Sequence, residues 1–325
     1  MHAKAVISEI LSKKTVDSVF FVACGGSLTD LYNGHFFLQT ESAAIRSYWM
    51  NANEFLHATP KALSENSLVI ACSHSGGTRE TVDAAQFAYD KGASVISMTF
   101  NKGSKIDKDL PGYVSWIYDW GDNVPAREKP EGMVLSLLNE LLHQTDPGYK
   151  LYDAMEAGLD QIDGIIAGAK AKVQNSAWLF ADRFQNTPML YILGSGGNFA
   201  QAYAMSICSL MEMQWMHCCY LHSGEYFHGP FETTDGNTPY ILMKGCGKTR
   251  ALDQRAEDFL RKYAGEGNCE VIDAEALGLG VLDESVQEYF NAPLFYQMAC
   301  KYRDALDYTR RHPLNMRRYM GVVEY

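Results

Sequence analysis

The sequence predicts an α/β protein of two similar domains, each a parallel sheet flanked by helices in a flavodoxin-like three-layer sandwich. Short runs of β-branched and aromatic residues alternate with helical stretches, which is typical of a parallel sheet covered on both faces. This alternation occurs in two blocks, and each block begins with a strand, a glycine turn and a helix. The length of 325 residues, 47% of them hydrophobic, suits two domains with ordinary cores.

The first block contains five predicted strands with helices between them. We expect the strands at residues 18–24, 43–49, 67–73, 93–100 and 113–120. Helices are expected from about residue 28, over 78–92 and over 132–144. The N-terminal stretch MHAKAVISEILSKK has the spacing of an amphipathic helix. These elements define a first domain at residues 1–148.

A purely helical stretch separates the two blocks. Residues 146–186 carry apolar side chains at helical spacing and contain no strand pattern, so we predict a helical connector. The second block then has strands within 188–197, 238–245 and 269–276, and helices over 198–215 and 249–263. We assign residues 149–325 to the connector, the second domain and a C-terminal tail.

Composition excludes several classes of protein. The net charge of −11 argues against a general nucleic-acid binder. No apolar run approaches the roughly 20 residues that span a bilayer, and the N-terminus lacks the apolar core of a signal peptide. The eight cysteines show no CxxC spacing, which is typical of reduced thiols in the cytoplasm. The adjacent Cys218 and Cys219 are poorly placed for an ordinary disulfide.

The most informative segment is SHSGGTRET, which follows the third predicted strand. Four hydroxyl residues stand within nine positions where a strand meets a helix: Ser73, Ser75, Thr78 and Thr81. Ligands of open α/β sheets bind at the carboxyl ends of strands, and a helix N-terminus offers unpaired N–H groups to an anion. A single hydroxyl would suffice as a helix cap. The sequence therefore favours a phosphate site here over simple capping.

Two other glycine turns are less specific. CGGSLTD follows the first strand and lacks the third glycine of a dinucleotide fingerprint. GSGGN, at residues 194–198, is explained equally well by a closely packed corner. No GxxxxGK[ST] loop follows a strand, so ATP binding is not indicated.

These motifs together resemble the sugar isomerase (SIS) family. The resemblance is carried by CGGS, by SHSGGTRET and by GEYFHGP in the second domain. The segments MEMQW to HSGEYFHGPFE, TRALDQRAEDFLRKY and HPLNMRRYMGVVEY are similar to deglycases of phosphorylated Amadori compounds. That group includes enzymes acting on 6-phosphofructose-aspartate and on fructoselysine 6-phosphate. The resemblance covers essentially the whole chain.

The resemblance implies roles for residues that match the motifs of the family. In the related isomerase domain of glucosamine-6-phosphate synthase, the serine–threonine loop holds the sugar phosphate. Its counterparts here are Gly26, Ser27, Ser73, His74, Ser75 and Thr78. The catalytic Glu of the second domain matches Glu212, and the catalytic His of the GExxHGP motif matches His228.

The chain also departs from the synthase. Met205 and Ser209 replace a Glu and a Lys of its catalytic helix, and Tyr319 stands where its tail has an imine-forming lysine. We also expect no N-terminal glutaminase domain, because the chain begins directly with the sugar domain. These differences argue against amination and suit a substrate that already carries nitrogen on C1.

The implied chemistry needs proton transfers and no metal or cofactor. A 1-amino-1-deoxyfructose 6-phosphate opens its ring, loses a C1 proton to give an enaminol, and gains a proton at C2. Water then hydrolyses the resulting imine to glucose 6-phosphate and an amino acid. Glu212 is our candidate for the acid–base group between C1 and C2, and His228 for ring opening.

Each of these residues also has a structural interpretation. Glu212 lies in a very apolar helix, where it needs a partner or a cavity, and an ion pair in a dimer interface would supply one. The structural interpretation of His228 is the cap of a turn before Gly229 and Pro230. For Glu225 a structural and a substrate-orienting role are balanced. A metal site from His222, Glu225 and His228 is disfavoured, because their spacing is not HExxH and glycine interrupts it.

The tail RRYMGVVEY is basic at its start. A solvated end is the plain interpretation of Arg317, Arg318 and Tyr319. Since SIS tails often reach the active site, these arginines are also candidates for binding a carboxylate of the amino-acid half, which favours aspartate as the leaving group. The family further implies a homodimer with the active site at the subunit interface, where Glu212 and His228 meet across chains.

Two alternatives to a deglycase remain at this point. An aldose–ketose phosphate isomerase would use the same site without releasing an amine. A non-catalytic sugar-phosphate sensor would need no Glu212 or His228, and such sensors often carry a DNA-binding domain for which no basic helix is present.

Overall fold

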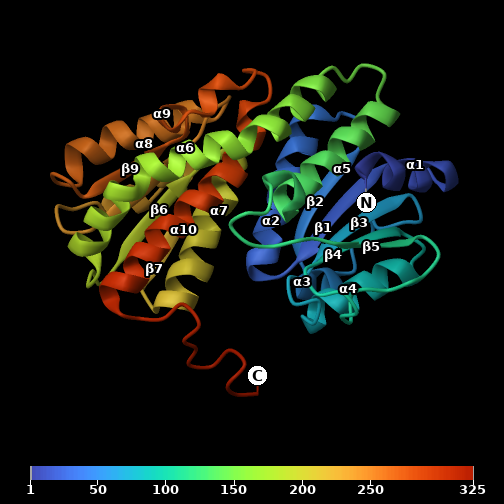
Figure 1. Cartoon of the computed structure of the whole chain (residues 1–325), viewed down its shortest axis with the longest axis horizontal. Coiled ribbons are helices and arrows are strands. Elements are labelled where there is room, and N and C mark those ends of the chain that lie inside the picture. Colours follow the sequence, from blue (N-terminus) through green and yellow to red (C-terminus); the bar gives the residue numbers. More distant parts are fainter. Residues whose placement is uncertain (1, 325) are drawn as a thin grey trace. The chain divides into compact units, whose positions relative to one another are not determined.

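The computed structural model describes residues 2–324, and the chain divides into two compact units, Met1–Asp160 and Gln161–Tyr325. Each unit contains one parallel sheet with helices packed on it (Figure 1). This confirms the predicted α/β class with two parallel sheets. The predicted boundary at residue 148 falls just before α6 (Tyr152–Phe184), whereas the two units divide inside that helix.

The first unit holds a five-stranded parallel sheet in the order β2-β1-β3-β4-β5. The strands are β1 (Ser18–Ala23), β2 (Arg46–Asn51), β3 (Ser67–Cys72), β4 (Ser94–Thr99) and β5 (Tyr113–Ile117). The central strands β1, β3 and β4 are buried along their whole length, as their continuous apolar sequences predict. The order reverses between β1 and β3, which is the point where open sheets of this type bind ligands.

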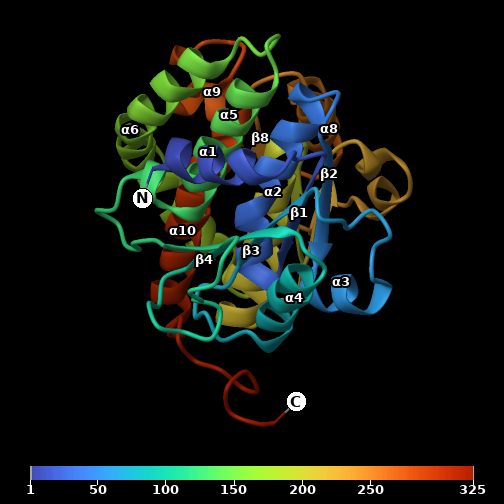
Figure 2. The same cartoon turned by 90° about the vertical axis from the view of Figure 1, so that its right-hand side faces the viewer.

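Two groups of helices cover this sheet. The helices α1 (Ala3–Lys13), α2 (Gly25–Glu41) and α5 (Pro130–Thr145) pack together, and α3 (Ala52–Ala58) packs on α4 (Arg79–Asp90) (Figure 2). Gly34 of α2 permits the first packing, because a Cβ there would lie 2.2 Å from Cγ1 of Val134 in α5. On the α3–α4 side, Phe20 and Val69 join the apolar core with Phe55 of α3.

The second unit repeats most of this topology. Its sheet has the order β7-β6-β8-β9, the same pattern as the first four strands of the other sheet. The strands are β6 (Leu190–Gly194), β7 (Cys218–His222), β8 (Tyr240–Lys244) and β9 (Cys269–Asp273). The edge strand β7 was missed by the sequence analysis, because only Cys218 in it is fully buried and its side chains do not alternate as a half-buried strand would.

The helices of the second unit include one irregular element. The helix expected over 198–215 consists of α7 (Phe199–Ala204) and a π-helical segment, η3 (Met205–Glu212). The others are α8 (Arg250–Tyr263), α9 (Ala274–Leu277) and α10 (Asn291–Arg310), the last of which the sequence analysis did not identify. All eight cysteines are free thiols, and no helix within residues 2–324 is long and apolar enough to cross a membrane.

Candidate functional site

The two predicted phosphate-binding turns meet at the reversal point of the first sheet. The register of the neighbouring strands β1 and β3 pairs Ala23 with Cys72, so the turns that follow them lie side by side. The backbone N–H of His74 donates a hydrogen bond of 3.2 Å to Oγ of Ser27. The structure therefore brings the CGGS turn and the SHSGGT loop into direct contact.

The hydroxyl groups of the loop bond to one another and to loop backbone. Oγ of Ser73 donates to Oγ1 of Thr78 at 3.1 Å, and the Gly77 N–H donates to Oγ of Ser75 at 3.2 Å. Thr78 occupies the N-cap position of α4 but makes no capping hydrogen bond with its side chain. The simple helix-cap explanation therefore fails for Thr78, and the first turn of α4 keeps N–H groups of the kind that bind anions.

The loop conformation requires a glycine at position 76. Gly76 has φ = +67°, and a Cβ there would lie 1.8 Å from Oγ of Ser104. The Ile106 N–H donates to the Gly76 carbonyl at 3.1 Å, which ties the loop to the segment after β4. These contacts hold the loop in one shape.

The His74 ring braces the loop from the outside. Its Nδ1 lies 2.9 Å from the hydroxyl of Tyr118, which follows β5, and its plane is parallel to the ring of Phe100. Partial burial lowers the pKa of His74, so the neutral imidazole is favoured. The ring is thus held in an aromatic setting, and it is the backbone of this residue that contacts Ser27.

Two buried acids beneath these turns were missed by the sequence analysis. Burial, reinforced by the charge of Glu131, raises the pKa of Asp30 well above its ordinary value. Burial raises the pKa of Glu131 in α5 to about 7, and its Oε1 has no hydrogen-bond partner among residues 2–324. Asp30 stands inside the CGGSLTD motif, but Glu131 belongs to a helix far along the chain and gives no local signal.

In the second unit, the tail brings an arginine onto Glu212. Glu212 is the last residue of η3, and its Oε1 accepts a hydrogen bond of 2.6 Å from Nη2 of Arg317. Each of these side chains is about a quarter exposed, at 24% and 21%. The ion pair considered for Glu212 therefore exists within a single chain, and the tail supplies its cation.

The backbone after Glu212 is strained, and the tail packs on it. Trp215 has φ = +52°, which is rare for a bulky residue. The guanidinium of Arg318 lies 4.4 Å from the Trp215 ring centroid, and the His312 ring meets the same indole edge to face at 4.5 Å. π-Helical segments and strained residues concentrate at functional sites. Tyr319, in contrast, is 64% exposed.

The GEYFHGP motif forms an exposed turn. A 3₁₀ turn, η4 (Glu225–Phe227), is followed by His228, whose N–H donates to the Glu225 carbonyl at 2.9 Å. Both side chains are exposed, and the His228 ring has no hydrogen-bond partner within residues 2–324. Neither residue contacts Glu212 in the single chain.

No metal centre forms around this turn. His222 Nδ1 accepts a hydrogen bond of 3.1 Å from the Gly224 N–H and is therefore engaged in the turn itself. Within the described part of the chain, no group of three or more His, Cys, Asp or Glu side chains is arranged to hold a metal ion.

The second glycine turn is a packing corner. Gly196 has φ = +55°, and a Cβ there would lie 2.4 Å from Oγ1 of Thr249. The buried carboxylate of Asp253 accepts hydrogen bonds from the hydroxyls of Ser195 and Ser223, at 2.8 and 2.6 Å. Burial raises the pKa of Asp253, although these hydrogen bonds oppose the shift. The polar groups of this corner are thus bonded to one another.

With this geometry in place, the likeness to known proteins is informative. The SIS domain model matches residues 14–110. The chain is 41% identical over 315 residues to the fructosamine deglycase FrlB of Bacillus subtilis, covering 97% of this chain and 94% of that one. The chain belongs to the SIS-domain family. The family resemblance carried by its motifs is therefore confirmed.

Other SIS-domain proteins agree with this assignment. The fructoselysine 6-phosphate deglycase of Escherichia coli K12 is 24% identical over 323 residues, which are 99% of this chain and 90% of that one. A crystal structure from Salmonella typhimurium LT2, described as a proposed phosphosugar isomerase, has 40% identity and a TM-score of 0.95. It covers 100% of this chain and 96% of its own.

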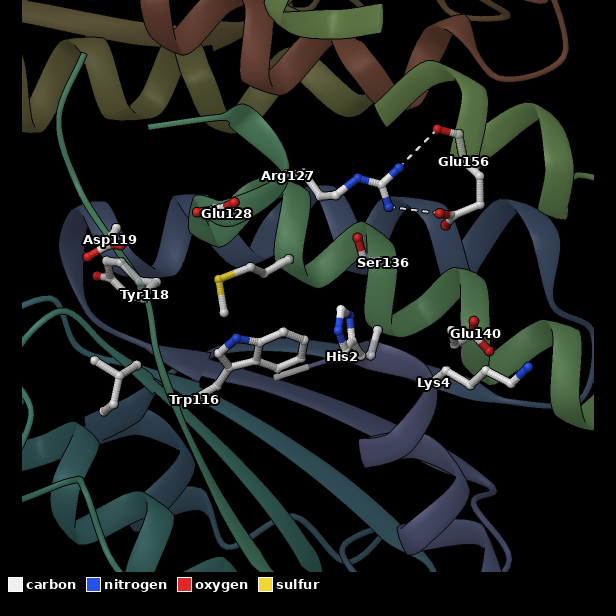
Figure 3. Close-up of a pocket in the computed structure, with 13 residues that line it drawn as sticks. His2, Lys4, Trp116, Tyr118, Asp119, Arg127, Glu128, Ser136, Glu140 and Glu156 are labelled. Atoms are coloured by element: carbon white, nitrogen blue, oxygen red, sulfur yellow. Dashed lines mark hydrogen bonds and ion pairs between the residues drawn. The ribbon is translucent and has the colours of Figure 1, made fainter. Parts of the chain in front are cut away.

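This SIS-domain protein also has a separate cavity in its first unit. The cavity has a volume of about 500 Å³ and lies between the end of β5, the start of α1 and the helices α5 and α6 (Figure 3). Arg127 borders it and is turned toward Glu156, with which it forms an ion pair of 2.7 Å (Figure 3). A second ion pair joins Arg127 to Asp160. None of the site residues predicted from the sequence lines this cavity, so it is distinct from the phosphate loop.

Proposed function

We propose that this protein is a cytoplasmic deglycase that hydrolyses a 6-phosphofructose–amino acid conjugate to glucose 6-phosphate and the free amino acid. The observation that carries the proposal is the position of the Glu212 carboxylate. It stands at the end of a π-helical segment and accepts a hydrogen bond from an arginine of the tail. The names of the relatives that match over nearly the whole chain, fructosamine deglycase and fructoselysine 6-phosphate deglycase, support the substrate class.

In this proposal the Ser–Thr loop binds the phosphate group. Its Ser73, Ser75 and Thr78 hydroxyls and the N-terminus of α4 supply hydrogen-bond donors without formal charge. Loops of this kind stabilise a phosphate dianion by direct hydrogen bonds, and such bonds to an ionised acceptor are stronger than neutral ones.

Glu212 and His228 then move the protons. His228 opens the furanose ring, and Glu212 removes a proton from C1 to give the enaminol. Returning that proton to C2 leaves a C1–N double bond, which water cleaves to the C1 aldehyde and the free amine. Each acid–base step of this type contributes about 10²–10⁴ in rate. The exposed ring of His228, which has no hydrogen-bond partner among residues 2–324, is consistent with a role toward substrate.

We propose aspartate as the amino acid released. Arg317 and Arg318 stand beside Glu212 and Trp215, and two cations at the site of an amine leaving group suit a conjugate with two carboxylates. Lysine, with its positive side chain, is the less favourable alternative on this charge argument.

We further propose a homodimer with the active site at the subunit interface. The tail exposes a run of apolar side chains, among them Tyr319, Met320, Val322 and Val323. Met211 beside Glu212 and Tyr220 on the edge strand β7 are also exposed, at 41% and 36%. Covering these side chains with a second copy would bring an exposed His228 to a Glu212 that it does not contact within one chain.

The test is a coupled assay for glucose 6-phosphate with 6-phosphofructose-aspartate and fructoselysine 6-phosphate. Wild type should release glucose 6-phosphate from one of them, and Glu212→Gln should lower kcat at least about 100-fold because it removes the proton-transferring group. Glu232→Gln, an exposed acid after the HGP turn, is the matched control and should retain activity.

Two outcomes would contradict the proposal. Unchanged turnover in Glu212→Gln would exclude Glu212 as the acid–base group. Interconversion of hexose phosphates without release of an amine from either conjugate would establish an isomerase instead.

A further inference from the structure

The ion pair between Glu212 and Arg317 places a cation on the group that the proposed reaction uses as its base. A hydrogen bond of 2.6 Å between a guanidinium and a carboxylate is short and charge-assisted. It occupies a lone pair of Oε1, and that lone pair is not available to substrate while Arg317 holds it. The contact therefore needs an explanation beyond packing.

Among residues 2–324, Glu212 is the one residue outside its own segment of tail to which the Arg317 side chain hydrogen-bonds. Its Nη1 donates to the carbonyls of Leu314 and Met316, at 2.7 and 2.9 Å, and both belong to the same stretch of tail. No other carboxylate pairs with it among residues 2–324. The guanidinium can therefore move to another anion without disturbing a helix or a strand.

The rest of the tail is fixed independently of this pair. Nε2 of Gln214 donates to the His312 carbonyl at 2.8 Å, and Arg318 lies over the Trp215 ring. These contacts keep the tail beside Glu212 when Arg317 leaves its ion pair with Glu212. The movement required is that of one side chain.

The connectivity of the substrate puts a competing anion within reach. In an amino-acid conjugate the α-carboxylate carbon is three bonds from C1, through the nitrogen and Cα, which is about 4 Å at ordinary bond lengths. The base that touches the C1 proton and the cation that touches the α-carboxylate must therefore be neighbours. Arg317 and Glu212 already are.

We propose that Arg317 exchanges partners on substrate binding: it leaves Glu212 and binds the α-carboxylate of the amino-acid half. The exchange trades one carboxylate for another, so the guanidinium is never left unpaired, and the bidentate geometry of arginine suits both. Glu212 loses its cation only when a carboxylate stands next to the nitrogen. This inference rests on the proposed deglycase function and adds a specificity-determining residue to it.

The exchange predicts how the enzyme treats amines without an α-carboxylate. Removing the α-carboxylate of aspartate gives β-alanine, and removing its side-chain carboxylate gives alanine. With the β-alanine conjugate Arg317 has no α-carboxylate to bind and stays on Glu212, so turnover is slow. The alanine conjugate keeps the α-carboxylate and releases Glu212.

The experiment compares wild type, Arg317→Gln and the control Arg311→Gln on the aspartate, alanine and β-alanine conjugates. Arg311 is an exposed cation at the start of the same tail. Arg317→Gln should lower kcat/KM about 100-fold for the two conjugates with an α-carboxylate, as loss of a desolvated charge pair does. On the β-alanine conjugate the same variant should be at least as fast as wild type, because Glu212 is freed. Arg311→Gln should match wild type throughout.

A binding measurement supports the kinetics without turnover. Conjugates reduced to the alcohol at C2 cannot enolise, so their affinities can be measured by calorimetry on any variant. Glu212→Gln should bind the reduced aspartate conjugate more tightly than wild type does, because Arg317 is already released. It should show no gain for the reduced β-alanine conjugate.

Four results would overturn the exchange. An equal loss on all three conjugates in Arg317→Gln would make Arg317 a positioning residue for Glu212 alone. No loss on any of them, or no gain of affinity in Glu212→Gln, would remove it from substrate recognition. If wild type releases no glucose 6-phosphate from these conjugates or from the lysine conjugate, the proposed function itself fails, and the exchange fails with it.

Discussion

At the scale of single residues, Glu131 is the clearest case of a side chain whose charge state depends on folding. Its carboxyl is buried in the first turn of α5, beside Asp30 of α2. Burial raises the pKa of Glu131 from its usual 4.5 to about 7. Between pH 4.5 and pH 7 the folded protein keeps this proton, whereas the unfolded chain releases it. The free energy of unfolding therefore falls as the pH rises through this range.

We therefore predict that Glu131→Gln changes the pH dependence of stability. The raised pKa of Glu131 does not lower the free energy of unfolding below pH 4.5, and it lowers it by the full amount above pH 7. The difference in unfolding free energy, variant minus wild type, should rise between pH 5 and pH 8 by up to about 3 kcal/mol. Urea unfolding at the two pH values measures this gain.

The exposed Glu128 provides the control for this prediction. Glu128→Gln, in the turn just before α5, should show the same difference from wild type at both pH values. A constant difference for Glu131→Gln as well would mean that the buried acid titrates as an exposed one does.

At the scale of an element, the loop between β3 and α4 owes its shape to one glycine. Gly76 combines a positive φ with a Cβ position that Ser104 occupies, whereas a Cβ on Gly77 would meet only Oγ of Ser75, at 3.8 Å. Position 76 thus requires a residue without a Cβ atom, whereas the neighbouring position 77 does not.

We predict that Gly76→Ala destabilises the protein and Gly77→Ala does not. The first change adds backbone strain and a steric clash, which together cost roughly 1–3 kcal/mol. Thermal unfolding should show a lower Tm for Gly76→Ala and a value near that of wild type for Gly77→Ala. Equal Tm values for the two variants would show that the loop yields to a side chain at position 76.

At the scale of the whole molecule, the question is whether Glu212 and His228 act within one chain. The single chain leaves His228 exposed, without contact to Glu212. A site shared between two copies would explain why an exposed histidine and a tail with an exposed apolar end occur in the same unit.

Subunit mixing tests the shared site. Glu212→Gln and His228→Asn should each be inactive alone, because each removes one proton-transferring group. Unfolded together and refolded, they form random dimers, and each mixed dimer has one intact site, so about a quarter of the wild-type activity should return. No recovery, with dimers verified by light scattering, would place both groups within one chain.

The sequence by itself determined the fold class and the family. Alternating apolar strands and helices can bury their faces only in covered parallel sheets, and SHSGGTRET keeps its hydroxyls together because they are neighbours in the chain. Local patterns of this kind survive in a linear sequence. The edge strand β7 was missed because it is short and only partly buried. Helix α10 was missed because its apolar and polar residues do not follow a clear helical spacing.

Only the tertiary structure decided which distant groups meet. The Arg317–Glu212 pair joins residues 105 positions apart, and the buried Asp30–Glu131 pair joins α2 to α5. It also decided that GSGGN is a packed corner, because Asp253 of α8 bonds to Ser195 and Thr249 lies against Gly196. Side-chain contacts across such separations depend on how elements pack, and the spacing of residues along the chain carries no record of that packing.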